Sequence, residues 1–195
     1  MFEIILKGGP VMVPIVAASL VSVAVIVERA IFWLKRAGRV DAEKVIRFAE
    51  EGRLESALKE CEKRESPLLK VLKAGLSSLN PALSMEAEAH KELKEMEKGL
   101  PTLDTIITLS PLLGLFGTIV GMIQSFGIMS EAGLNNPHAI TGGIAEALIA
   151  TAGGIAVAVI TLVPYNYFRS RVERTLNDIE RYATRLEVVI RGRLR

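Results

Sequence analysis

Residues 140–168 read ITGGIAEALIATAGGIAVAVITLVPYNYF, and the only charged side chain in this stretch is Glu146. After Glu146, no charged residue follows until Arg169, which leaves 22 uncharged residues in a row. A helix of that length can cross a hydrocarbon core of about 30 Å. We therefore expect a membrane-spanning helix over residues 139–168.

Glu146 lies about two turns inside this expected helix. Inserting a carboxylate there costs on the order of 2–3 kcal/mol, and such residues usually face a bundle interior or a wet path. Thr151 follows five residues later, about 140° around a helix, so the two side chains should meet different neighbours. We interpret Glu146 as part of an ion path. The alternative is a structural carboxylic acid that holds an assembly together.

Two further uncharged runs, 8–27 and 105–130, complete a set of three expected spans. Pro10 and Pro14 fall in the first turns of the first run, where proline is tolerated. The intervening residues are polar and helical in pattern, so the predicted fold class is all-α, an integral membrane protein with a cytoplasmic helical region. The expected segments are an N-terminal lead (1–7), span 1 (8–27), the cytoplasmic region (28–104), span 2 (105–130), a short loop (131–138), span 3 (139–168) and a basic tail helix (169–195).

Small residues recur at helical spacing in spans 2 and 3. Close helix packing in lipid favours such rows, and the residues concerned are Gly114, Gly117, Gly121, Ala150, Gly154 and Ala158. Thr118 and Thr151 stand among them. A single threonine in a span usually bonds the carbonyl four residues before it, which is a structural role, whereas two threonines among small residues on adjacent spans favour a shared polar lining. The facing of the other polar residues in the spans stays open at this stage, namely Thr108, Ser110, Gln124, Ser125, Thr141 and Thr161.

Local signals divide the polar region into several helices. Asp41 is placed to cap a helix that runs through Ala49, and Gly52 should end it. Ser66-Pro67 and Asn80-Pro81 each resemble an N-cap followed by proline at the first helical position. Glu60 and Arg64 have the spacing of a favourable ion pair.

The hydrophobic pattern adds three expectations for packing. Leu68, Val71, Leu72 and Leu79 should form a buried helix face. Residues 86–98 should continue toward the membrane as the stem of span 2. The tail carries apolar residues at helical spacing among arginines, and we interpret it as a membrane-adjacent or bundle-forming helix. The pattern rests on Val172, Leu176, Ile179, Leu186 and Val189.

The distribution of Lys and Arg sets the expected orientation. Positive residues follow span 1 and span 3, whereas the 131–138 loop has none. Cytoplasmic loops are enriched in such residues. We expect the N-terminus and the short loop in the periplasm, and the 28–104 region and the tail in the cytoplasm.

Other functional classes have little support in these residues. No nucleotide-binding, zinc-protease or serine-hydrolase motif occurs, and neither histidine nor Cys61 has the spacing of a metal site. We therefore expect no enzyme activity, no cofactor and no metal. The net charge of +2 is small, and the basic tail is expected for membrane topology alone, so no nucleic-acid partner is predicted.

Two motifs and an opening segment resemble the MotA/TolQ/ExbB proton channel family. The run LSPLLGLFGTIVGM at 109–122 is similar to its second-span signature, and IAEALIATAGG at 144–154, continuing through Pro164-Tyr165-Asn166, is similar to its third. GGPVM at 8–12 through Glu28-Arg29 resembles the opening of the ExbB/TolQ branch. Three spans also fit that branch, because MotA proteins have four.

The resemblance implies a homopentameric bundle around a central pore in the cell inner membrane. The pore would hold the single spans of an ExbD- or TolR-like partner, whose aspartate takes up and releases protons. Thr118 and Thr151 match the pore threonines, and Glu146 matches the third-span glutamate. Proton motive force would then energise a TonB- or TolA-like protein. A non-conducting membrane scaffold is the alternative, and neither ExbB versus TolQ nor proton versus sodium is decided.

Overall fold

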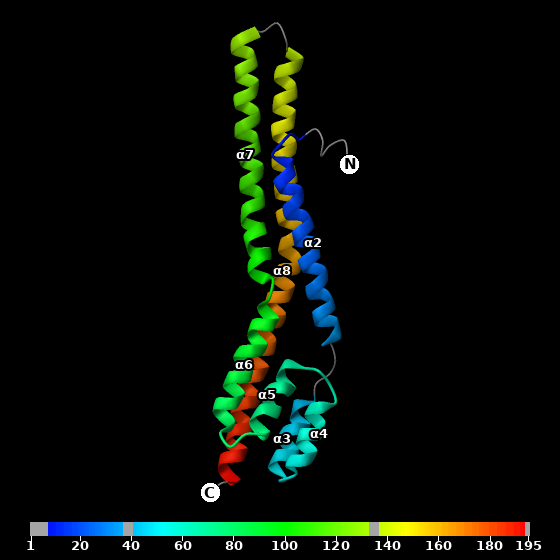
Figure 1. Cartoon of the computed structure of the whole chain (residues 1–195), viewed down its shortest axis with the longest axis vertical. Helices are drawn as coiled ribbons and strands as arrows, with labels where there is room; N and C mark the ends of the chain where they lie inside the picture. The colour runs from blue at the N-terminus through cyan, green and yellow to red at the C-terminus, as the bar shows by residue number, and fades with distance from the viewer. Residues whose placement is uncertain (1–7, 37–40, 133–136, 194–195) are drawn as a thin grey trace. The chain divides into compact units, whose positions relative to one another are not determined.

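The structure is a computed structural model that describes residues 8–36, 41–132 and 137–193 (Figure 1). Every regular element in these ranges is an α-helix, which confirms the predicted all-α class. The helices are α2 (Met12–Lys35), α3 (Ala42–Glu50), α4 (Leu54–Glu62), α5 (Pro67–Leu76), α6 (Pro81–Glu97), α7 (Leu100–Ala132) and α8 (Pro137–Arg193). Three stretches, in α2, α7 and α8, are long and apolar enough to cross a membrane.

The chain forms two compact units. The first, here called the apolar unit, comprises Met1–Glu28 and Gly99–Asn166, and the second, the polar unit, comprises Arg29–Lys98 and Tyr167–Arg195. The predicted N-terminal lead (1–7) lies outside the described residues, as do residues 133–136 of the predicted loop. α8 continues without a break through the end of the predicted third span into the tail, with Pro164 inside the helix.

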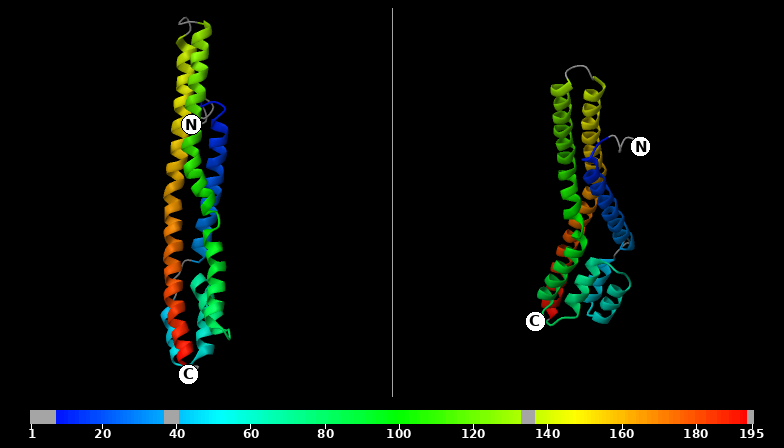
Figure 2. Two further views of the ribbon diagram at one scale, coloured as in Figure 1. Left: turned by 90° about the vertical axis from the view of Figure 1, so that its left-hand side faces the viewer. Right: turned by 45° about the horizontal axis from the view of Figure 1, so that its top comes forward.

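In the apolar unit, α2 and α7 both pack against the N-terminal part of α8 (Figures 1 and 2). The buried centre where α2 meets α8 is formed by Met12, Ile15 and Ala150. Most other large apolar side chains of these helices point outward, as expected of helices surrounded by lipid or by other subunits.

Helix starts in the polar unit follow local sequence. The Asp41 carboxylate accepts a hydrogen bond from the Lys44 amide at 3.2 Å and so caps α3. Gly52 has φ +83°, a left-handed conformation that favours glycine, and it separates α3 from α4. Pro67 and Pro81 occupy the first turns of α5 and α6 as predicted, although neither preceding side chain makes the capping hydrogen bond.

Two packing predictions are wrong. Leu79 is fully exposed, because α5 ends at Leu76 and the helical periodicity that would bury Leu79 no longer applies. Glu60 forms ion pairs with Lys44 and Lys63, at 3.3 and 2.7 Å, in place of the predicted Arg64. The predicted stem of span 2 is interrupted only at Gly99, which has φ +78° and lies where α6 passes into α7.

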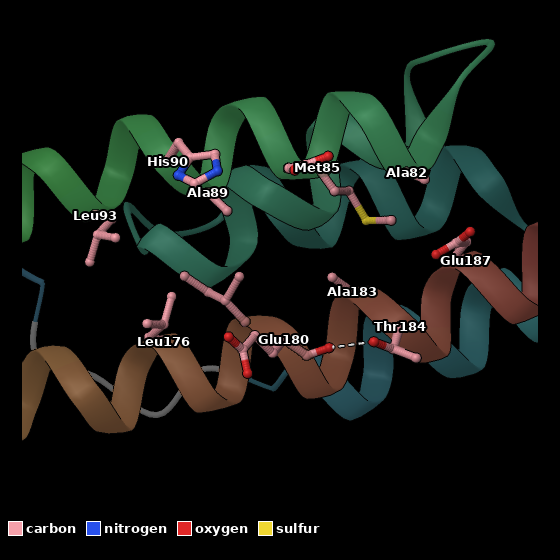
Figure 3. Close-up of a pocket in the computed structure, with 12 residues that line it drawn as sticks. Ala82, Met85, Ala89, His90, Leu93, Leu176, Glu180, Ala183, Thr184 and Glu187 are labelled. Atoms are coloured by element: carbon pink, nitrogen blue, oxygen red, sulfur yellow. Dashed lines mark hydrogen bonds between the residues drawn. The ribbon is translucent and has the colours of Figure 1, made fainter.

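The tail segment of α8 is a bundle-forming helix within the polar unit. Val172, Ile179 and Leu186 of its predicted apolar face are buried. It lies beside α6, and a groove of about 450 Å³ between the two helices is lined by both (Figure 3). Arg185 reaches α3 through a two-pronged ion pair with Glu43, at 2.7 and 2.8 Å. That pairing lowers the pKa of Glu43.

We expect the only cysteine, Cys61, to be nearly inert toward thiol reagents in the folded protein. Burial raises its pKa from 9.0 to about 12, so at pH 8 the reactive thiolate is roughly a thousandfold scarcer than in the unfolded chain. The check is the rate of iodoacetamide labelling at pH 8, with and without denaturant. Similar rates in both states would contradict this description of the α4 environment.

Candidate functional site

The contact between α7 and α8 depends on glycines that let the two backbones approach. A Cβ atom on Gly114 would lie 2.9 Å from the Thr151 Cα, and one on Gly121 would lie 2.8 Å from the Gly143 carbonyl oxygen. A Cβ atom on Gly154 would collide with the carbonyl oxygen of Ser110. These neighbours are backbone atoms, which cannot rotate away. Contact at this range between two spans is typical of helix packing in lipid.

Thr151 is bound to α7 through this close contact. Its hydroxyl donates a hydrogen bond to the Gly114 carbonyl at 2.8 Å. In a regular α-helix, that same carbonyl accepts the backbone amide of Thr118. The Thr118 hydroxyl donates to the Leu115 carbonyl at 2.6 Å. Both hydroxyl protons are therefore engaged within the chain, and each oxygen keeps lone pairs that can accept a further hydrogen bond.

α2 covers only one side of the α7–α8 contact. A Cβ atom on Gly117 would lie 3.4 Å from a methyl of Val11, and one on Gly153 would lie 3.2 Å from Met12. Thr118 is one residue past Gly117 and about 100° around α7, while Thr151 is two residues before Gly153 and about 160° around α8. Both threonines thus lie along the edge opposite α2. We call this the open edge.

Exposed apolar side chains surround both threonines along the open edge. On each helix they stand three residues before and four residues after the threonine, which places them on the same face. They are Leu115 and Met122 around Thr118, and Leu148 and Ile155 around Thr151, all more than a third exposed. The edge is therefore an apolar surface with hydroxyl oxygens in its middle. Such a surface can pack against an apolar helix that carries one polar group.

Glu146 lies apart from these threonines. Its carboxylate reaches over Gly9, which precedes α2, and a Cβ atom on Gly9 would overlap the Glu146 Oε1 atom. Gly9 also has φ +69°, so only glycine fits this position without strain. The structure therefore brings Thr118 and Thr151 to one edge and places Glu146 on the side of α2. The spacing of Glu146 and Thr151 predicted that their side chains meet different neighbours. The structure confirms this, because Glu146 contacts Gly9 and Thr151 contacts Gly114.

The sequence reasoning missed a buried hydroxyl pair between α2 and α8. Ser22 Oγ lies 2.7 Å from Thr161 Oγ1, and both residues are buried. The Thr161 proton is donated to the Val157 carbonyl at 2.7 Å, so Ser22 is the donor in the pair. A serine in an uncharged span needs a partner in lipid, and that requirement was the available signal.

Other polar residues in the spans now have a known facing. Ser110 and Ser125 are buried in the apolar unit, and the Ser125 hydroxyl donates to the Gly121 carbonyl at 2.9 Å. Ser110 Oγ has no hydrogen-bond partner among the described residues. Thr108, Gln124 and Thr141 are exposed. Among the described residues, no group of three His, Cys, Asp or Glu side chains is arranged to hold a metal ion.

Comparison with known proteins assigns the chain to a family. The model of the MotA/TolQ/ExbB proton channel family matches residues 49–181. The biopolymer transport protein ExbB-like 3 of Synechocystis is 36% identical over 95% of this chain and 93% of its own length. The Tol-Pal system protein TolQ of Pseudomonas aeruginosa is 33% identical over 56% of this chain and 47% of its own. The biopolymer transport protein ExbB of Aquifex aeolicus is 38% identical over 45% of this chain and 59% of its own length.

These matches agree with the three long apolar helices and with the motifs at 109–122 and 144–154. The resemblance read from those motifs is thereby confirmed. The Synechocystis protein, which matches along almost its whole length, carries the ExbB-like name, whereas the P. aeruginosa TolQ matches over about half of this chain. The chain is a membrane protein that belongs to the MotA/TolQ/ExbB proton channel family.

Proposed function

We propose that this chain is the three-span subunit of an inner-membrane proton channel and motor. It assembles as a homopentamer around a central pore, with the N-terminus in the periplasm and the polar unit in the cytoplasm. The pore holds the single spans of an ExbD- or TolR-like partner. Proton flow through the complex energises a TonB- or TolA-like protein for outer-membrane transport or envelope maintenance.

The open edge of α7 and α8 is the observation that carries this proposal. Thr118 and Thr151 stand there among exposed apolar side chains, on the side of the helix pair that α2 leaves uncovered. A ring of such edges has apolar walls with hydroxyl oxygens at one level. A partner aspartate in its neutral form can donate a hydrogen bond to those oxygens and can also pass the apolar wall.

The charged form of that aspartate needs donors instead of acceptors. The Thr118 and Thr151 hydroxyls then have to rotate away from the Leu115 and Gly114 carbonyls. Each hydrogen bond to a charged group is worth about 1.5–3 kcal/mol. One elementary charge moving through the membrane field gains about 2.3 kcal/mol per 100 mV. The two energies are comparable, so the field can drive the aspartate onto and off the threonine hydroxyls and move the partner relative to the ring.

The test is proton flux into vesicles that hold the complex with its partner. We expect the Thr118→Val/Thr151→Val double variant to lower flux at least tenfold, because two hydrogen bonds to a charged group are lost. Thr118→Ser/Thr151→Ser keeps both hydroxyls and should retain flux. Thr105→Val is the matched control, since the Thr105 hydroxyl is exposed and donates to the Pro101 carbonyl of its own helix at 2.9 Å.

Unchanged flux in the valine double variant would refute the role given to these threonines. Assembly is followed in parallel by size-exclusion chromatography, because Thr151→Val also removes the hydrogen bond to α7. Glu146→Ala separates the scaffold alternative. If it lowers assembly yet leaves the flux of correctly assembled complexes intact, Glu146 is structural. Repeating the measurement with a sodium gradient identifies the ion.

A further inference from the structure

A polar cavity in the polar unit is lined by residues that carry buried, unpaired hydrogen-bond donors. Its volume is about 300 Å³, and it is lined by residues from the end of α2, the start of α5 and the tail segment of α8. The charged residues that line it are Arg36, Arg171 and Asp178, so the walls carry a net charge of +1. An anion of moderate size fits both the volume and the sign.

Trp33 lines this cavity and carries a buried donor. The residue is only 7% exposed, and its indole Nε1 has no hydrogen-bond partner among the described residues. A buried N–H group left unpaired costs about 1–3 kcal/mol. A ligand that accepts this hydrogen bond removes that penalty.

Both arginines lie over aromatic rings. The Arg36 guanidinium lies 3.8 Å from the centre of the Phe32 ring, and the Arg171 guanidinium lies 5.5 Å from the Trp33 ring. A guanidinium group held over a ring by a cation–π contact still has N–H donors for oxyanions. The Nε atoms of both arginines are buried and have no hydrogen-bond partner in the described parts of the chain.

The N-terminus of α5 completes the set of donors. Ser66 and Pro67, which open this ten-residue helix, line the cavity, and the Ser66 side chain does not cap the helix. The first amides of a helix have no intrahelical acceptor, and the helix dipole favours an anion there. Asp178 opposes such a ligand, but it is exposed to solvent. Thr175 donates its own proton to the Arg171 carbonyl at 2.9 Å.

We infer that this cavity is a phosphate-binding site, with the headgroup phosphate of a phospholipid or free inorganic phosphate as its source. Two of the residues that line the cavity follow the ends of spans 1 and 3 closely in the sequence. Trp33 is five residues beyond Glu28 on α2, about 7.5 Å of helix, and Arg171 is two residues beyond Arg169 on α8. That spacing corresponds to the depth of lipid headgroups.

Trp33 is the only tryptophan of the chain, so its fluorescence reports directly on this cavity. The full-length protein in dodecylmaltoside is titrated with dioleoylphosphatidylglycerol, with inorganic phosphate, and with dioleoylglycerol, which lacks phosphate. We expect a saturable change in Trp33 emission with a phosphate-bearing probe and none with dioleoylglycerol. Saturation by phosphatidylglycerol alone identifies the lipid as the source, and saturation by inorganic phosphate identifies the free ion.

The double variant Arg36→Gln/Arg171→Gln should bind whichever phosphate-bearing probe saturates the wild type at least tenfold more weakly. Lys35→Gln/Arg174→Gln is the matched control, because it removes the same charge from exposed positions on the same two helices. Circular dichroism establishes that both pairs fold, and native mass spectrometry of the wild type counts phosphatidylglycerol bound per chain. Equal weakening in both pairs, a response to dioleoylglycerol, or the absence of any saturable response would overturn the assignment.

Discussion

Replacing Gly154 with valine should separate α7 from α8 and destabilise the apolar unit by about 3 kcal/mol, the upper end of the usual range for overpacking. A Cβ atom at this position collides with the Ser110 carbonyl oxygen and lies 3.1 Å from the Gly114 Cα. Backbone atoms cannot rotate away, so the helices themselves have to move. The same movement would break the hydrogen bond from Thr151 to Gly114.

Gly127→Val is the control for this experiment. Gly127 also lies in α7, but a Cβ atom there has no heavy atom within 4 Å. The change should leave the unfolding temperature nearly constant, since valine is a slightly better helix former than glycine. Thermal unfolding in detergent, followed by circular dichroism, compares the two variants. If Gly154→Val melts together with Gly127→Val, the close contact of α7 and α8 is not present in the protein.

Replacing Lys70 with methionine should destabilise the polar unit by about 2–3 kcal/mol. Glu92 is 2% exposed, and its Oε1 atom lies 2.7 Å from the Lys70 Nζ atom. Its second oxygen has no hydrogen-bond partner among the described residues. Removal of one partner from a buried ion pair leaves an uncompensated charge, which costs about 3–5 kcal/mol. The smaller value is expected here because Lys70 is partly exposed.

Two further variants separate this effect from a general loss of charge. Lys70→Met/Glu92→Leu should recover most of the wild-type stability, since it removes both charges and fills the space with apolar groups. Lys73→Met removes a neighbouring lysine of α5 whose pair with Glu62, at 2.8 Å, is exposed, and should change stability by less than about 1 kcal/mol. Hydrogen exchange of the α5 and α6 amides measures all three. Equal losses for Lys70→Met and Lys73→Met would show that the burial of Glu92 has no energetic consequence.

Features that depend on short stretches of chain were predictable from the residues alone. An uncharged run long enough to cross a bilayer has to be helical, because lipid offers no partner for its backbone groups. That requirement accounts for α2, α7 and the N-terminal part of α8. Local backbone chemistry likewise accounts for the start of α3 after Asp41 and for the helices that begin at Pro67 and Pro81.

The candidate site was predictable only in part. The residue types and the angular separation of Glu146 and Thr151 follow from helical periodicity, and the family follows from two motifs. The Thr151 bond to Gly114, the position of Glu146 over Gly9 and the pair of Ser22 with Thr161 do not follow from either. Each joins residues far apart in the chain, so it depends on how helices pack and on no local preference.

In other places the local rules gave the wrong result, and the tertiary structure decided the outcome. Leu79 lies beyond the end of its helix, and Glu60 pairs with Lys44 and Lys63 instead of the expected Arg64. Helical spacing says which side chains share a face, but not which neighbour covers that face. The residues alone therefore determined a helical membrane protein with three spans and its family. Packing alone decided that Thr118 and Thr151 share an open edge while Glu146 lies beside α2, because that choice depends on contacts between distant segments.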